Sequence, residues 1–302
     1  MRDLSEANLT DAVLETISGI EDPRLKRIIT SAIKHAHDFA RDVELRPDEL
    51  FQAAQFLTAI GKISDETRHE FLLLSDTLGL TMLVDTIQSR KPDGATETSV
   101  LGPFYRAEAP EVANGENIDR GDTGGDPTVV HGTIKDLDGE PIANALLDIW
   151  QATQQGIYEN MDPDQPDLNL RGRLRTDRNG EYWFRTVLPS YYPIPDDGPA
   201  GQLLHLCKRH NMRPGHIHFI VSAEGFEPVT TEVFREGDDY LDSDAVFGVK
   251  ESLVADFVES HDAGDAAKWN MPVPFHAMRY DFVLAPGSGS ADPGFTAGSG
   301  DG

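Results

Sequence analysis

The chain has 302 residues and a net charge of −26, because 52 acidic residues outnumber 26 basic ones. A surface this acidic repels nucleic acid and anionic lipid, so we expect neither as a partner. The sequence holds no apolar run of the roughly 18 residues that a membrane-spanning helix needs, and its start lacks the features of a signal peptide. Cys207 is the only cysteine, which excludes an intrachain disulfide and is consistent with a cytoplasmic protein.

Amphipathic helices are predicted before residue 90. Segments 23–33 and 46–57 each have apolar residues at helical spacing and a proline near the start. A third helix is expected to begin with Ser64 or Asp65 as its N-cap and to continue as far as Ile87. These helices carry more apolar surface than so small a unit can bury. They are therefore expected to form a homodimer interface or, alternatively, to pack wholly on the rest of the chain.

From about residue 127 the pattern changes to short strands between turns. A hairpin is expected at 175–185, where Asn179-Gly180 favours a tight turn, and a helix at 250–258. Strands are expected at 129–134, 145–152, 216–222, 229–234 and 280–284. Such a series of strands is typical of an antiparallel sandwich.

The predicted fold class is therefore α+β, with a helical N-terminal region followed by an antiparallel β-sandwich. We place the helical region at 1–100 and the sandwich at 101–285. The tail, 286–302, consists almost wholly of small and polar residues and is expected to be disordered.

His216 and His218 are the most informative pair in the chain. They lie two residues apart in a predicted strand, so both imidazoles point to the same face and can bind one metal ion. Imidazole suits Zn, Cu, Fe and Ni alike, and Arg213 adds a fixed positive charge nearby. The alternative is that the two histidines are ordinary hydrogen-bonded polar residues of a strand.

The usual completions of such a histidine pair are cysteine, a third histidine or a carboxylate, of which a single cysteine excludes a thiolate cluster. Tyrosines are further candidates for the remaining ligands. Tyr158 follows Gly156 in a predicted loop, and Tyr191 and Tyr192 lie in a proline-rich one. Two phenolates with two imidazoles suit a ferric ion and disfavour its reduction. Loop tyrosines are more often amphipathic packing residues, so this alternative stays open at the level of the residues alone.

The chain resembles the intradiol, non-haem Fe(III) dioxygenases that cleave catechols. The resemblance covers nearly the whole chain except its termini, and the combined pattern is highly specific. It rests on Leu101-Gly102-Pro103-Phe104-Tyr105, Asp148-Ile149-Trp150-Gln151-Ala152, the two tyrosine loops and Arg213-Pro214-Gly215-His216-Ile217-His218. The family fold that it implies, a helical dimerisation region and a β-sandwich, agrees with the pattern of predicted elements.

The resemblance implies that Tyr158, Tyr192, His216 and His218 bind the iron. It further implies that Tyr192 leaves the metal to act as a base and that Arg213 stabilises negative charge on the substrate. A substrate pocket similar to that of the hydroxyquinol-cleaving branch is expected from Leu73, Asp76, Leu101, Gly102, Pro103, Phe104, Ile194, Pro195, Arg213 and Val246. In that pocket Asp76 would accept a hydrogen bond from a third substrate hydroxyl, or else it is a helix-surface or capping carboxylate.

Two positions depart from the catechol enzymes, which typically carry Gln where this chain has Glu232 and often Ala where it has Gly215. The activity implied is cleavage of hydroxyquinol (benzene-1,2,4-triol) by O2, giving 3-hydroxy-cis,cis-muconate and then maleylacetate. Two alternatives remain. One is the same chemistry on catechol or a chlorocatechol, and the other is a non-catalytic β-sandwich in which the two histidines hold a structural zinc.

Overall fold

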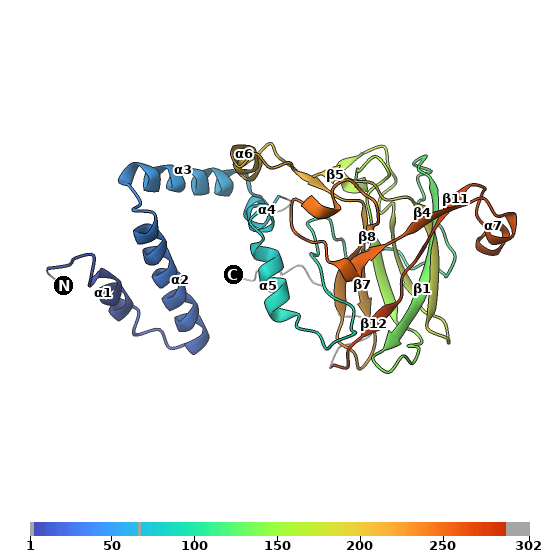
Figure 1. Cartoon of the computed structure of the whole chain (residues 1–302), viewed down its shortest axis with the longest axis horizontal. Coiled ribbons are helices and arrows are strands. Elements are labelled where there is room, and N and C mark those ends of the chain that lie inside the picture. Colours follow the sequence, from blue (N-terminus) through green and yellow to red (C-terminus); the bar gives the residue numbers. More distant parts are fainter. Residues whose placement is uncertain (1–2, 66–67, 288–302) are drawn as a thin grey trace. The chain divides into compact units, whose positions relative to one another are not determined.

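The computed structural model describes residues 3–65 and 68–287, and the chain divides into two units, residues 1–62 and 63–302 (Figure 1). The first unit contains helices α1 (Leu9–Thr16) and α2 (Pro23–Asp42) and all but the last residue of α3 (Pro47–Ile63). Helix α2 begins where the sequence predicts, because Asp22 accepts hydrogen bonds from the backbone N–H groups of Arg24 and Leu25. The two helices expected at 23–33 and 46–57 are confirmed.

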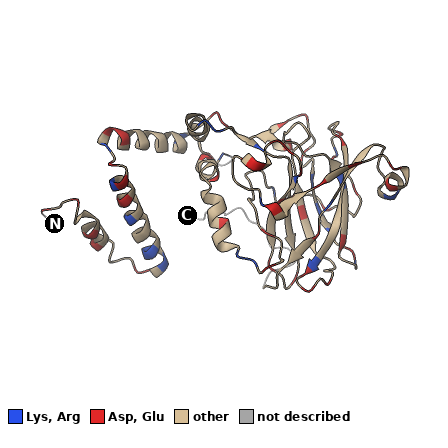
Figure 2. Ribbon diagram, viewed as in Figure 1, with Lys and Arg blue, Asp and Glu red and all other residues tan. Residues whose placement is uncertain are grey.

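The helices of the first unit leave most of their apolar side chains exposed. Ile60 is the one fully buried apolar side chain among the described residues of this unit. Figure 2 shows that α2 carries both basic and acidic residues, whereas the paired strands are mostly uncharged. The exposed large apolar residues of the unit are Leu4, Leu9, Leu25, Ile28, Phe39, Val43, Leu50, Phe51 and Leu57.

The third predicted helix is two helices, α4 (Glu70–Thr77) and α5 (Leu80–Gln88). They are separated at Gly79, whose φ of 71° lies in the left-handed region that glycine adopts without steric cost. The expected N-cap role of Ser64 or Asp65 is wrong as stated, because α4 begins only at Glu70. The Ser64 hydroxyl nevertheless accepts a hydrogen bond from the Glu70 N–H at 3.3 Å.

The second unit also contains two five-stranded sheets (Figure 1). The first sheet contains β10 (Phe257–Ser260), β11 (Phe275–Arg279), β1 (Pro127–Asp136), β12 (Phe282–Leu284) and β4 (Glu181–Val187). The second runs in the order β3 (Arg171–Arg175), β2 (Leu146–Trp150), β7 (His216–Ser222), β8 (Val229–Arg235) and β9 (Val254–Ala255). A separate two-stranded ladder joins β5 (Tyr192–Pro193) and β6 (Met212–Arg213). The predicted α+β class is confirmed, although β1–β11, β1–β12 and β8–β9 pair in parallel.

Side chains from both sheets meet in one apolar core. Strand β1 contributes Val130 and Ile134, and β7 contributes alternate residues, Ile217, Phe219 and Val221, each at most 1% exposed. Because strand side chains alternate between faces, the intervening residues of β7 lie on the opposite face of that sheet. The core thus fixes which face of β7 carries the two histidines.

Two predictions about local structure are wrong. Segment 175–185 is not a hairpin, because β3 pairs with β2 and β4 pairs with β1, so the Asn179-Gly180 turn connects the two sheets. The helix expected at 250–258 is a short 3-10 turn, Glu251–Leu253, followed by β9 and β10. There the β-branched Val254 pairs with Phe234 of β8, so strand pairing overrides the helical spacing of the apolar residues.

The connections carry two more helices, α6 (Pro199–Leu206) and α7 (Ala263–Trp269), and the 3-10 turns Glu159–Met161 and Leu241–Ser243. None of the described helices is long and apolar enough to cross a membrane. The predicted disordered tail lies outside the described residues from residue 288 onward.

Candidate metal centre

His216 and His218 project from the face of β7 that lies opposite its apolar core residues. His218 is paired with Trp150 of β2 on one side and with Glu232 of β8 on the other. The Trp150 and His218 rings stack at 4.6 Å with only 6° between their planes. Cross-strand pairing therefore holds the His218 ring in one orientation.

Four donor atoms from three segments converge at this face. The Nε2 atoms of His216 and His218 lie 3.2 Å apart, and His216 Nε2 lies 3.4 Å from the Tyr192 hydroxyl. The Tyr192 hydroxyl lies 3.5 Å from that of Tyr158. All four residues are at most 6% exposed. Two imidazole nitrogens and two phenol oxygens this close together form a buried donor set that a hard trivalent cation would fit.

Short local structures position the two tyrosines. Tyr192 lies on β5, which pairs with β6 so that Tyr192 is opposite Arg213. Tyr158 ends the loop before the 3-10 turn, and Phe104 stacks on its ring at 4.4 Å. Gly156 in that loop has a φ of 78°, and a Cβ there would lie 2.5 Å from the Tyr192 Cβ. Only glycine therefore allows the two loops to approach this closely.

Burial sets the protonation of the donors. Burial lowers the pKa of both histidines, and the nearby Arg213 charge lowers each further. Burial likewise raises the pKa of both tyrosines, well above the usual value for Tyr158. His216 Nδ1 lies 2.7 Å from the Pro214 carbonyl, which can only accept, so Nδ1 carries the proton and Nε2 presents a lone pair to the site.

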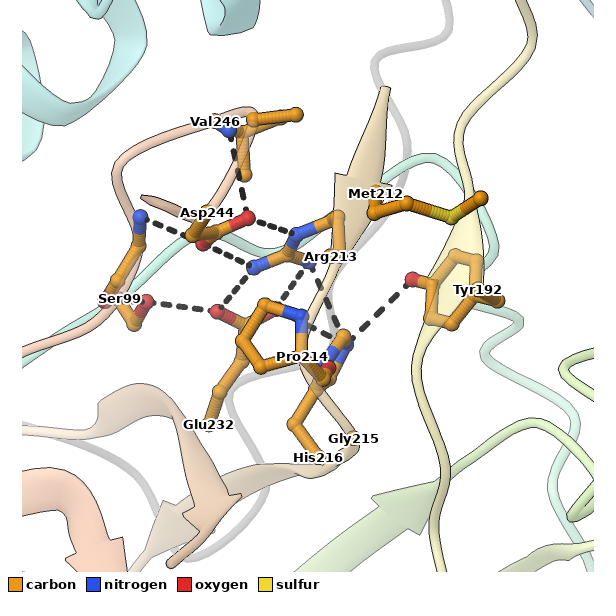
Figure 3. Close-up of polar contacts among 12 residues, drawn as sticks. Ser99, Tyr192, Met212, Arg213, Pro214, Gly215, His216, Glu232, Asp244 and Val246 are labelled. Carbon is orange, nitrogen blue, oxygen red and sulfur yellow. Dashed lines mark hydrogen bonds and ion pairs between the residues drawn. The ribbon is translucent and has the colours of Figure 1, made fainter. Parts of the chain in front are cut away.

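Arg213 lies beside the donors at the centre of a buried ion-pair cluster (Figure 3). Its Nη1 and Nη2 donate to Glu232 at 2.7 and 2.9 Å, and its Nε and Nη2 donate to Asp244 at 3.1 and 3.2 Å. Burial alone would lower the pKa of Arg213, but the two carboxylates outweigh it and raise the pKa well above its usual value. The remaining N–H of Nη1 faces His216 Nε2, and the two nitrogens lie 3.3 Å apart.

Glu232 offers a second possible ligand set with the two histidines, since their donor atoms lie within 4.8 Å of one another. Both Glu232 oxygens, however, already accept hydrogen bonds from Arg213, and Ser99 donates to Oε2 at 2.7 Å. A carboxylate bound by three donors is less available to a metal than a phenol oxygen that faces the histidines. The contacts therefore favour the tyrosines as ligands and Glu232 as a neighbour of the metal site.

The predicted pocket residues divide between two apolar clusters. Leu73, Ile194 and Val246 share one cluster, and Leu101 and Phe104 pack with Tyr158 and Tyr192 in another. A Cβ on Gly102 would lie 3.2 Å from His218, which places this backbone at the donor set. Pro103 is exposed and Pro195 is partly exposed. Burial raises the pKa of Asp76, and the charges of Arg213, Glu232 and Asp244 also act on it.

Sequence reasoning singled out Glu232 only as a departure from the catechol enzymes, with no role assigned, and left Ser99 and Asp244 out of the predicted site. Glu232 carries a recognisable sign in the sequence, because it is a carboxylate in the middle of a predicted buried strand. Ser99 and Asp244 carry none, since they lie in loops that are far from Arg213 along the chain and only tertiary packing brings them there.

Comparison with known proteins agrees with this geometry. Residues 100–286 match the family model described as dioxygenase, and residues 22–96 match that of the catechol dioxygenase N terminus. A hydroxyquinol 1,2-dioxygenase of a Rhizobium species is 47% identical, over 93% of this chain and 95% of the relative. A 6-chlorohydroxyquinol 1,2-dioxygenase of Cupriavidus pinatubonensis is 42% identical, over 95% of this chain and 99% of the relative.

Among solved structures, the hydroxyquinol 1,2-dioxygenase of Pseudomonas putida superposes with a TM-score of 0.88 at 44% identity. That match covers 93% of this chain and 99% of the other. Family models spanning both the helical region and the sandwich, and relatives of this identity over nearly the full length, show that the chain belongs to the intradiol ring-cleavage dioxygenase family.

Proposed function

We propose that this protein is a hydroxyquinol 1,2-dioxygenase, which cleaves the ring of benzene-1,2,4-triol with O2 between the two adjacent hydroxyl-bearing carbons. The observation that carries the proposal is the convergence of four buried donors, Tyr158, Tyr192, His216 and His218, beside an arginine. The product is 3-hydroxy-cis,cis-muconate, which tautomerises to maleylacetate.

In this proposal the four donors hold a non-haem Fe(III) ion. Phenolate is a hard anionic ligand, and the buried tyrosines with raised pKa values lose their protons at neutral pH only to a strong Lewis acid. Bound Fe(III) would supply Lewis-acid polarisation and a template for the two adjacent substrate oxygens. Tyr192 contacts His216 through its hydroxyl and lies opposite Arg213 in the β5–β6 ladder, so its oxygen is placed to accept a proton from a substrate hydroxyl.

Arg213 supplies positive charge at the edge of the same site. Its Nη1 hydrogen that faces His216 Nε2 is the one N–H not used on a carboxylate. His216 would hold the metal through the Nε2 lone pair, which would leave this Arg213 N–H free to be donated to substrate. A fixed donor in a site from which water is excluded stabilises a developing negative charge by about 3–4 kcal/mol.

Substrate choice is assigned to Asp76 and the apolar walls. Leu73, Ile194 and Val246 form an apolar surface that suits an aromatic ring. Asp76 carries a raised pKa because of burial, and a partly desolvated carboxyl forms a strong hydrogen bond with a third ring hydroxyl. The names of the similar proteins from Rhizobium and Pseudomonas putida support hydroxyquinol as substrate. Catechol and chlorocatechols are the alternative.

We further propose that residues 1–100 form the dimerisation region of a homodimer and that 101–285 form the catalytic domain. Support comes from the exposed apolar residues of the first unit, among them Leu25, Ile28 and Phe39. Cys207 is an exposed free thiol, which suits the reducing cytoplasm.

The visible spectrum of the iron-loaded protein tests the metal site. We expect a broad phenolate-to-iron band that moves to longer wavelength when hydroxyquinol is added without oxygen, and a smaller response to catechol. Tyr192→Phe should change the band and abolish turnover, whereas Tyr191→Phe, which alters the exposed neighbour, should leave both unchanged. Absence of a band in iron-replete protein would refute the tyrosine ligands and favour the structural-zinc alternative.

A substrate panel tests the assignment to hydroxyquinol. Oxygen uptake should be fastest with hydroxyquinol, and Asp76→Asn should reduce that preference relative to catechol. If the unaltered protein turns over catechol or a chlorocatechol faster, the substrate assignment passes to that alternative and the intradiol chemistry stands.

A further inference from the structure

Glu232 is a fully buried carboxylate whose position is set by the sheet. It lies opposite His218 in the β7–β8 ladder and is 0% exposed. Because directly opposite residues of an antiparallel pair project to the same face, its side chain lies beside the metal-facing histidine. The strand around it is largely buried, so a charged residue here carries a large desolvation cost that its contacts must offset.

The two carboxylate oxygens of Glu232 have different partners. Oε2 accepts from Ser99 Oγ at 2.7 Å and from Arg213 Nη2 at 2.9 Å. Oε1 accepts from Arg213 Nη1 at 2.7 Å and also lies 3.4 Å from His218 Nδ1 and 3.4 Å from His216 Nε2. Oε1 is thus the anionic atom that faces the two histidines. Ser99 and Arg213 hold the other oxygen, Oε2 (Figure 3).

His218 Nδ1 is the atom that this carboxylate can influence most. It is buried and has no hydrogen-bond partner among the described residues, unlike His216 Nδ1, which has the Pro214 carbonyl. A negative oxygen 3.4 Å away favours the proton on Nδ1 and leaves the Nε2 lone pair for a metal. A carboxylate beside the outer nitrogen of a histidine ligand also makes the imidazole a stronger donor.

We propose that Glu232 is a positioning residue that gives the iron site its electronic character: it favours the ligand tautomer of His218, strengthens His218 as a donor and holds Arg213. This inference rests on the proposed iron site. Glutamine cannot take over all three roles, because whichever Glu232 oxygen becomes an amide nitrogen places a donor against an Arg213 N–H. The acidic residue at this position therefore makes the iron of this chain more electron-rich than a glutamine would.

The experiment compares iron-loaded Glu232→Gln with the unaltered protein. A weaker donor at His218 leaves the iron electron-poorer. The phenolate-to-iron band should therefore move to longer wavelength, and the Fe(III)/Fe(II) potential should rise. Retention of iron against a chelator should fall about 10- to 100-fold, as for other residues that support a metal ligand. A purely structural role would lower thermal stability without moving the band or the potential.

Asp244→Asn is the matched control. This substitution removes the same unit of negative charge from the Arg213 cluster as Glu232→Gln does. The Asp244 carboxylate, however, contacts Arg213 and the backbone N–H groups of Val246 and Gly248 rather than a histidine. We expect a smaller shift of band and potential in this variant. Equal shifts in the two variants would overturn the inference, since the effect would then pass through Arg213 alone.

Glu232→Asp covers the case in which Glu232→Gln does not fold. It keeps the charge but withdraws it from His218, so the band should move in the same direction by a smaller amount. A band at the unaltered position in iron-loaded Glu232→Gln, or in Glu232→Asp when the former is not obtained, overturns the inference. If the unaltered protein itself shows no band, it is the proposed iron site that fails.

Discussion

Arg171 and Arg213 are both buried against carboxylates on the second sheet and its loops, at 1% and 3% exposure. Arg171 forms a two-pronged pair with one partner, Glu159, through Nε and Nη2 at 2.8 Å each. Its Nη1 has no hydrogen-bond partner among the described residues. Glu159 also accepts a hydrogen bond from Nη1 of Arg106 at 3.1 Å, so one carboxylate lies between two cations, and Arg106 itself pairs with the exposed Asp167 at 2.7 Å.

Arg213 has the opposite balance, with two carboxylates around one guanidinium. All five of its N–H groups point at an acceptor: four at Glu232 and Asp244, and one at His216 Nε2. The difference teaches which arginine is structural. Arg171 holds the 3-10 turn that follows Tyr158 through its pair with Glu159. The N–H of Arg213 that does not bind a carboxylate points instead at His216 Nε2, an atom of the proposed metal site.

Removing Arg213 should have the largest effect. Arg213→Met leaves Glu232 and Asp244 buried without their cation, so we expect a loss of about 3–5 kcal/mol in the free energy of unfolding. It also removes the donor beside the substrate, which lowers kcat by about 100- to 1,000-fold. Denaturant unfolding and steady-state kinetics with hydroxyquinol measure the two effects. A folded variant with unaltered kcat would remove Arg213 from the proposed mechanism.

Removing Arg171 should lower the free energy of unfolding and leave the proposed metal site intact. Arg171→Met leaves Arg106 as the one cationic contact of Glu159 among the residues that the structure describes, so the loss should be at the low end of the range for broken buried pairs, about 3 kcal/mol. The phenolate band of folded, iron-loaded protein should persist. Combining the change with Glu159→Leu should recover part of the stability, because no unpaired charge then remains. A lost band would show that this arginine also supports Tyr158.

A methyl group at Gly248 should strain the Arg213 cluster directly. A Cβ there would lie 2.8 Å from Arg213 Nη2 and 2.9 Å from Glu232 Oε2. Gly248→Ala should therefore cost about 1–3 kcal/mol in unfolding free energy. Gly61→Ala is the control, because outside the adjoining backbone of its own helix no described residue has an atom within 4 Å of a Cβ placed there. The site is helical, so this substitution should stabilise by about 0.5–1 kcal/mol. Equal effects of the two substitutions would contradict the tight packing at Gly248.

The smallest expected effect is on the part of the pH dependence of stability that Asp76 contributes. The charge of Asp76 interacts with those of the Arg213 cluster. Burial raises its pKa in the folded state, so the folded protein holds this proton more tightly than the unfolded chain does. The contribution of Asp76 to the free energy of unfolding consequently falls as pH rises through the raised pKa. Asp76→Asn should raise Tm at neutral pH and have less effect at acidic pH. Thermal melts across pH check this, and a Tm lowered at neutral pH would contradict it.

Much of the site could be predicted because its ligands lie in local patterns. His216 and His218 share a face of a strand by simple alternation, and Tyr158 and Tyr192 lie in recognisable loops. The structure brings all four together, while their role as ligands stays a prediction. The helix expected at 250–258 and the hairpin at 175–185 failed for one reason. Local spacing and turn residues do not say which strand will be the partner.

The sequence by itself determined the fold class, the family resemblance, the acidic character and the candidate donors, because composition, periodicity and short motifs depend on neighbours along the chain. Only the tertiary structure decided that Arg213 is enclosed by Glu232 and Asp244, and that Glu232 faces His218. These contacts join residues from separate strands and loops. Their geometry follows from strand register and sheet packing, which no local pattern of residues specifies.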